Sequence, residues 1–138
     1  SQNLTKVDNI IKSYPNVSSI EELAKKIDYD FSTKIEKARA AYTWLALNIS
    51  YKKNELLKST EMIVSFSKDD LERRKKYLEK IRKEKITNST FNSRNGVCEG
   101  YALIFKRLCD LLTIENDLIK GYAKTLPNEI IYIIKRMS

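Results

Sequence analysis

The chain contains no histidine, and among its 138 residues there are only two cysteines, three glycines and two prolines. Thiol catalysis ordinarily depends on a neighbouring imidazole that takes the thiol proton, so this sequence cannot supply a complete Cys–His pair. No apolar run approaches the ~20 residues that a membrane-spanning helix needs, so we expect no membrane span. The scarcity of glycine, together with 42% hydrophobic residues, favours a globular, helix-rich protein over a disordered one.

The two cysteines, Cys98 and Cys109, fall on one predicted helix. Eleven positions of helical rise separate them by ~16 Å, which is too far for a disulfide if that helix is continuous. Two separated thiols without histidine also cannot assemble a zinc or iron site. We therefore expect neither a metal nor a cofactor.

The length of the chain fits one domain, 1–138, that is long enough to bury a real core. Its first residue is serine and not methionine, which is the kind of start that removal of a signal peptide would leave. Secretion or export to a periplasm is therefore one expectation, although a cloning scar would look the same. The localisation stays unknown on this basis.

The first thirty residues are predicted to form two short helices, an N-terminal extension over 1–30. Apolar residues at three-and-four spacing define the first helix, and Pro15 ends it. Ser19 followed by Glu22 is the capping-box pattern, and it predicts the start of the second helix.

A third helix is predicted from the same signal, because Thr33 and Glu36 form another capping box. This helix is apolar nearly all round as far as Ile49, so it should lie at the centre of the protein. Trp44 is interpreted as a core residue of this helix and not as a ligand-stacking one.

A strongly charged helix is predicted over 68–85. It holds nine of the 26 lysines and arginines and five of the 18 acids, and so four of the eight net positive charges. A cluster of basic side chains is typical of proteins that bind the phosphates of nucleic acids. Because acids alternate through the cluster, the pattern fits a solvated helix with ion pairs better, and we expect no nucleic acid. Residues 88–95 are predicted to be a polar loop.

Cys98 follows that loop at the start of a further predicted helix. Gly96 is expected to let the backbone turn sharply, and the apolar run that begins at Tyr101 has the spacing of a buried helix face. At a helix start, unpaired N–H groups and the macrodipole favour the thiolate, the form that attacks carbonyl carbon. Cys98 is therefore the candidate nucleophile, whereas Cys109 in the middle of the same helix is interpreted as a core residue.

The segment Arg94–Ala102, with Leu103–Cys109 and Ile119–Lys124 after it, resembles the core of the bacterial transglutaminase-like superfamily. Lys37–Tyr51 is similar to the helix that precedes the nucleophile in that family. The resemblance covers roughly 35–125. It implies a papain-like arrangement and acyl transfer or peptide hydrolysis, with a protein or peptide as substrate or partner.

The resemblance also implies roles for the residues around the nucleophile. Cys98 would attack, and its own N–H would stabilise the oxyanion. Gly96 and Val97 would support the nucleophile loop. Arg94 would favour the thiolate and Glu99 would oppose it, although both residues could equally be surface charges that hold the loop.

The chain departs from the family after Lys124. The family's catalytic histidine and aspartate lie in a His-Ala-Trp-Asn stretch and near an Asp-Thr-Trp strand, and neither stretch occurs here. Tyr132 stands in the place in chain order where the histidine would come. With a pKa near 10 it is a poor base at neutral pH, and it is better explained as a packed strand residue.

Whether the protein is an enzyme is therefore left open, and three hypotheses follow. The first is the nucleophile-bearing part of a transglutaminase-like enzyme, inactive as given because its C-terminal histidine and aspartate strands are missing. The second is a degenerate family member that serves as a binding or structural module. The third is a basic helical interaction protein.

Two strands are predicted at the end of the chain, Asp117–Lys124 and Glu129–Lys135, with a turn at Leu126–Asn128. The predicted fold class is α+β, a helical N-terminal part followed by a nucleophile helix packed on a small antiparallel sheet, as in a truncated papain-like core. The run from Ile130 to Ile134 is apolar on both alternating faces, so we expect a homodimer through 129–136.

Overall fold

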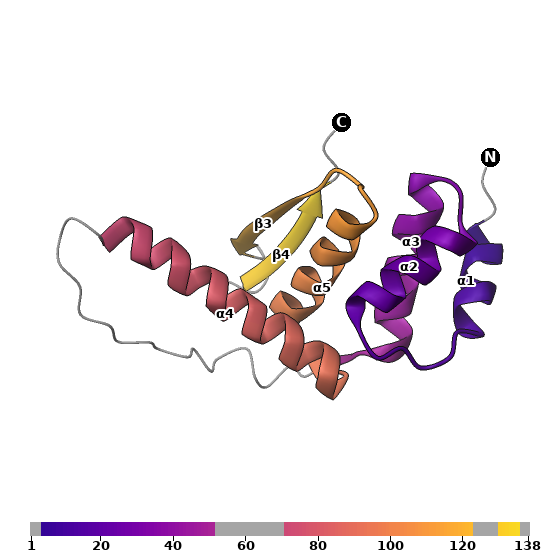
Figure 1. Ribbon diagram of the computed structural model, residues 1–138, viewed down its shortest axis with the longest axis horizontal. Helices are drawn as coiled ribbons and strands as arrows, with labels where there is room; N and C mark the ends of the chain where they lie inside the picture. Colours follow the sequence, from indigo (N-terminus) through magenta and orange to yellow (C-terminus); the bar gives the residue numbers. More distant parts are fainter. Residues whose placement is uncertain (1–3, 52–70, 123–129, 136–138) are drawn as a thin grey trace.

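The computed structural model of the protein describes residues 4–51, 71–122 and 130–135, and it describes side chains at 4–51 and 71–116. Figure 1 shows the helices and strands of these segments. In chain order they are α1 (Leu4–Lys12), α2 (Ile20–Asp30), α3 (Lys34–Asn48), β1 (Ser50–Tyr51), α4 (Leu71–Ser93), β2 (Asn95–Gly96), α5 (Cys98–Leu111), β3 (Asp117–Tyr122) and β4 (Ile130–Lys135).

The predicted starts of α2 and α3 are confirmed. The Thr33 hydroxyl accepts a hydrogen bond from the Glu36 N–H at 3.1 Å, and the Glu36 carboxylate accepts one from the Thr33 N–H, which completes a capping box. At α2 the Ser19 hydroxyl caps the Glu22 N–H at 3.0 Å, but the Glu22 carboxylate accepts instead from the N–H and hydroxyl of Ser18. Local polar signals therefore set the helix boundaries in the first part of the chain.

The core lies where α1, α2, α3 and α5 meet the C-terminal end of α4. Trp44 is 2% exposed, and its ring stacks on that of Phe91 with centroids 5.7 Å apart, which confirms its interpretation as a core residue. Helix α3 enters the core through Ala40, Ala41, Trp44 and Leu45, but it is not enclosed on all sides as its apolar sequence suggested, because Tyr42 and Leu47 are 59% and 52% exposed. The buried apolar residues are Val7, Ile11, Val17, Ile20, Leu23, Ala24, Ile27, Phe31, Ala40, Ala41, Trp44, Leu45, Ile49, Phe91, Ile104, Leu108, Cys109, Leu112 and Ile114.

The predicted loop at 88–95 is largely wrong, because α4 continues to Ser93. Thr87, Thr90 and Phe91 are buried residues of this last stretch. Their packing stabilises a helical continuation that their weak intrinsic helix propensity does not indicate. Figure 1 shows α4 extending away from the other helices toward Leu71. The predicted beginning of this helix, from Lys68, lies outside the described residues.

The predicted fold class is wrong, because the protein is not an α+β papain-like core. Five helices make up most of the described chain, and its strands form two separate two-stranded pairs. β1 and β2 are two residues each and pair in parallel, with Ser50 opposite Asn95 and Tyr51 opposite Gly96. Among the described residues no third strand joins either pair, so neither pair offers the broad face that a sheet-packed core requires.

β3 and β4 form an antiparallel hairpin whose register runs from Asp117 opposite Lys135 to Tyr122 opposite Ile130. A hairpin was predicted in this part of the sequence. It lies against α5, on the side away from α2 and α3 in Figure 1. The predicted turn at Leu126–Asn128 lies outside the described residues.

The side chains of β4, including Tyr132, also lie outside those described, so the homodimer through 129–136 stays a prediction. In the segments that the structure describes, no helix combines the length and the apolar character that crossing a membrane requires.

Candidate functional site

Cys98 is the first residue of α5, as predicted. Val97 is the N-cap in extended conformation, and its side chain makes no capping hydrogen bond. The first N–H groups of α5 are therefore left without a side-chain cap, next to the sulfur of Cys98. Both Cys98 and Cys109 are free thiols.

The sharp turn before Cys98 does not occur at Gly96. No glycine of the described residues has a positive φ, whereas Arg94 does, with φ 55°. Gly96 is needed for a different reason, because a Cβ at this position would lie 2.5 Å from the Thr90 side chain. A Cβ at Gly100 would lie 2.3 Å from the same side chain. The two glycines therefore let α4 approach β2 and α5 closely.

Arg94 holds the loop before Cys98 in place. Its guanidinium donates hydrogen bonds to the carbonyl oxygens of Phe91 and Val17, the latter at 2.7 Å. It also lies over the rings of Phe91 and Trp44, 4.0 and 5.1 Å from their centroids. These contacts support the loop-holding role that was one of the two alternatives for Arg94, rather than an effect on the thiol.

Glu99 turns toward α4. Its carboxylate accepts hydrogen bonds from both terminal nitrogens of Arg82, at 2.5 and 3.1 Å, and Arg82 also pairs with Glu79 at 2.6 Å. The two carboxylates raise the pKa of Arg82 above its ordinary value, through hydrogen bonds first and charge second. Glu99 thus links the start of α5 to the middle of α4.

Two tyrosines flank the thiol. The parallel pairing of β1 with β2 places Tyr51 opposite Gly96, two residues before Cys98. The Tyr101 hydroxyl donates a hydrogen bond to the carbonyl oxygen of Ile49, and its ring meets that of Tyr51 edge-on at 6.0 Å. The segment that follows α3 is therefore fastened to the first turn of α5.

An open, mainly apolar hollow of about 530 Å³ lies between α3 and α5 at this point. Tyr42 and Tyr51 border it and are 59% and 50% exposed, although aromatic rings usually bury much of their surface. We call it the Cys98 groove, and it is lined by Tyr42, Leu45, Ala46, Tyr51, Cys98, Tyr101, Ala102 and Phe105.

The electrostatics of Cys98 favour the neutral thiol. Burial raises the pKa of the Cys98 thiol above its usual value, while hydrogen bonds from the Glu99 N–H and the Tyr51 hydroxyl oppose this shift. Burial raises the pKa of Cys109 to about 11. Cys98 is half-buried and lines the Cys98 groove, whereas Cys109 is buried, 1% exposed, beside a smaller hollow of about 220 Å³.

This arrangement provides part of a catalytic site. Backbone N–H groups of Cys98 and Glu99 at the start of α5 favour the thiolate by hydrogen bonding to the sulfur, but the sequence contains no imidazole to take its proton. In the segments with described side chains, no cluster of three or more histidine, cysteine or acidic residues is arranged to hold a metal ion.

The structure thus brings Cys98, Val97 and Glu99 together at the start of α5, with Gly96 and Arg94 in supporting positions behind them. The sequence did not single out Tyr42 or Tyr51 as site residues. Tyr51 reaches Cys98 through a pairing between segments some forty residues apart. No local pattern indicates such a contact.

Comparison of the chain with protein-family models, with curated proteins and with solved structures finds no match. The transglutaminase-like resemblance therefore stays a prediction that depends on the residues around Cys98.

Proposed function

We propose that this protein binds an apolar segment of a partner polypeptide in the Cys98 groove, and that Cys98 is a contact residue there rather than a nucleophile that turns over. The observation that carries this proposal is an open apolar hollow bordered by two half-exposed tyrosines, in a chain without histidine. Exposed apolar surface of this kind is costly in a protein with no partner and marks interaction sites.

The lining favours a polypeptide as the occupant. Tyrosine supplies a large contact area with few rotatable bonds, together with a hydroxyl that can pair with the backbone of a bound chain. Tyr42 of α3 offers this combination, and Tyr51 of β1 adds a second ring whose hydroxyl hydrogen-bonds to the Cys98 sulfur. The hollow has the size of a typical ligand site and would receive two or three side chains of a bound segment.

A blocking variant tests the proposal. Ala46 is exposed on α3 and lines the groove, so Ala46→Trp should fill it without disturbing the core. Leu47→Trp is the matched control, because Leu47 is 52% exposed on the same helix but does not line the groove. Peptides selected from a displayed random library should bind the parent protein and Leu47→Trp, but not Ala46→Trp, and should protect Cys98 from alkylation. Binding that is indifferent to Ala46→Trp would contradict the proposal.

A second candidate is acyl transfer from Cys98 with a base that this chain does not carry. The N–H groups directed at the sulfur favour it, because they would stabilise a thiolate or a tetrahedral oxyanion. The chain alone should then show no turnover with an amine donor and a glutamine-rich protein, since loss of a triad member removes several powers of ten in rate. Crosslinking that disappears in Cys98→Ala would establish this second function instead.

A further inference from the structure

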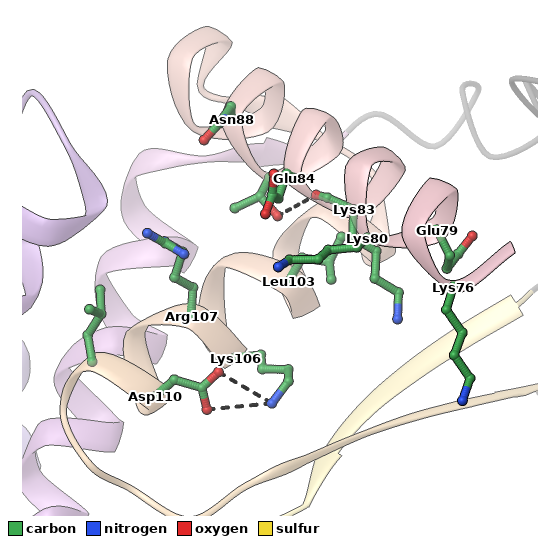
Figure 2. Close-up of a pocket in the computed structure, with 12 residues that line it drawn as sticks. Lys76, Glu79, Lys80, Lys83, Glu84, Asn88, Leu103, Lys106, Arg107 and Asp110 are labelled. Carbon is green, nitrogen blue, oxygen red and sulfur yellow. Dashed lines mark hydrogen bonds and ion pairs between the residues drawn. The ribbon is translucent and has the colours of Figure 1, made fainter. Parts of the chain in front are cut away.

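A second hollow, of about 900 Å³, lies between α4 and α5. We call it the lysine groove, because Lys76, Lys80 and Lys83 of α4 line one wall. Figure 2 shows the amines of Lys80 and Lys83 on the side of α4 that faces α5, with Lys106 on the opposite wall. It is distinct from the Cys98 groove and shares no lining residue with it.

The three lysines of α4 have no ion-pair partner among the described residues. They stand four and three positions apart on the helix, so their charges lie side by side and repel one another. The groove also contains Glu79, but its carboxylate is paired with Arg82 at 2.6 Å. Glu84 of α4 also lines the groove, so the three lysines of this wall outnumber its two carboxylates and leave an excess of positive charge, which an anionic ligand would relieve.

The α5 wall is different in character. Lys106 pairs with Asp110 at 3.4 Å, and Arg107 pairs with Glu21 of α2, so these cations are already partly satisfied. Leu111, which is 43% exposed, supplies the accessible apolar surface between them, whereas Leu103 at the back of this wall is 7% exposed. One wall of the lysine groove is thus cationic and the other mixes paired charges with apolar contact.

This lining disfavours a nucleic acid. A phosphodiester strand presents closely and evenly spaced charge, and it would meet the carboxylates of Glu79, Glu84 and Asp110, all of which line the groove. Among the described side chains that line the groove none is aromatic, so they offer no platform on which a base could stack. A polypeptide with separate acidic and apolar side chains fits the two walls better.

The spacing of the lysines specifies the ligand further. Lys76 and Lys80 are separated by ~6 Å of helical rise, close to the ~7 Å between alternate residues of an extended chain. Alternate side chains of such a chain point to opposite sides. We propose that the lysine groove binds an extended acidic segment of a partner protein, with alternate carboxylates on Lys76, Lys80 and Lys83 and intervening apolar side chains against Leu111.

The probe for this proposal is a fluorescein-labelled peptide of alternating glutamate and leucine, titrated with the full chain and followed by fluorescence anisotropy. Lys80→Glu combined with Lys83→Glu should weaken binding about tenfold or more, because like charges then face the peptide. The matched control combines Lys75→Glu with Lys85→Glu, which changes net charge equally at exposed positions of α4 outside the groove. At an ionic strength that screens the long-range effect of net charge, this control should change the affinity by less than about twofold.

Three further arms decide the outcome. A peptide with glutamine in place of glutamate should not bind, and circular dichroism should show both double variants folded. If the two double variants weaken peptide binding equally, the effect comes from net charge alone and the proposal is overturned. Tighter binding of single-stranded DNA that depends on Lys80 and Lys83 would overturn it in favour of nucleic acid. The Ala46→Trp variant should leave peptide affinity unchanged, which separates this site from the Cys98 groove.

Discussion

The Cys98 groove and the lysine groove lie along the same helix, yet their chemistry differs. Their residues on α5 are centred roughly 160° apart around the helix axis. The described lining of the Cys98 groove includes tyrosine rings and no charged residue, whereas that of the lysine groove is mainly charged. The difference comes from the second wall of each groove. Helix α3 forms that wall of the Cys98 groove, and α4 forms that wall of the lysine groove.

The comparison shows how one scaffold can offer two kinds of surface. Helix α3 has no strongly apolar stripe because it carries apolar residues on its exposed side as well as its buried side. Tyr42 and Ala46, on the exposed side, line the Cys98 groove. The described residues of α4 that are buried fall only in its C-terminal part, so the remainder is free to carry repeated lysines. Variants of the shared scaffold should therefore impair both grooves, and variants of one lining should impair one.

The largest expected effect comes from Trp44→Ala, which removes the ring that joins α3 to Phe91 of α4. Trp44 is 2% exposed, and deleting a buried indole typically costs ~3–5 kcal/mol because a cavity is left. Urea unfolding should show this loss, and both grooves should lose their ligands. Leu47→Ala, at an exposed position of the same helix, is the control and should change stability by less than ~0.5 kcal/mol. A loss below ~1 kcal/mol for Trp44→Ala would contradict the packing described.

A smaller effect is expected from Gly100→Ala, which inserts a Cβ 2.3 Å from the Thr90 side chain. Thr90 is buried and β-branched, so it cannot rotate away easily, and overpacking of this kind costs ~1–3 kcal/mol. Thr90→Ala should recover part of the loss, because it removes the two nearest atoms. A double-mutant cycle measures this coupling. Additive effects would mean that α4 and α5 do not touch at this point.

The sequence predicts well where the signal is local. The capping pattern at Thr33 and Glu36, the helix start at Cys98 and the hairpin formed by β3 and β4 all rest on residues that are close in the chain. Each of these features is determined by hydrogen bonding or apolar spacing over a few residues. Such signals survive without knowledge of the rest of the fold.

The sequence predicts poorly where distant segments decide the structure. The stretch 88–95 looks like a polar loop, and only the burial of Thr90 and Phe91 shows why α4 continues through it to Ser93. Tyr51 enters the Cys98 groove through a pairing with Gly96 that no local pattern encodes. The predicted papain-like class is wrong for a similar reason. It depended on a resemblance around Cys98, and that motif fixes only the start of one helix and not the strands around it.

The two thiols give the next sharpest test of the open groove. Cys98 should be alkylated by iodoacetamide at least about tenfold faster than Cys109, because Cys98 borders a hollow and Cys109 is buried with a pKa raised to about 11. Mass mapping after brief labelling measures the order, and in urea the two rates should converge. The rate at Cys98 should still be rising above neutral pH, since burial raises its thiol pKa too. Faster labelling of Cys109 than of Cys98 in the native protein would contradict the position of Cys98 beside an open groove.

The smallest effect is expected from Tyr51→Phe, which removes one hydroxyl from the Cys98 groove. That hydroxyl hydrogen-bonds to the sulfur and opposes the upward shift of the Cys98 pKa, so its loss should raise the pKa further. Only the thiolate is alkylated, so labelling at neutral pH should slow by about twofold to fivefold, the value of one hydrogen bond.

The pH profile separates this electrostatic effect from a change in access. If Tyr51 acts on the thiolate, the profile of Tyr51→Phe moves to higher pH while the limiting rate at alkaline pH stays the same. Tyr42→Phe is the matched control, because Tyr42 lines the same groove but does not contribute to the pKa of Cys98. A changed limiting rate, or an equal shift in Tyr42→Phe, would contradict this role. Tyr51 would then affect access to the groove and not the pKa of the Cys98 thiol.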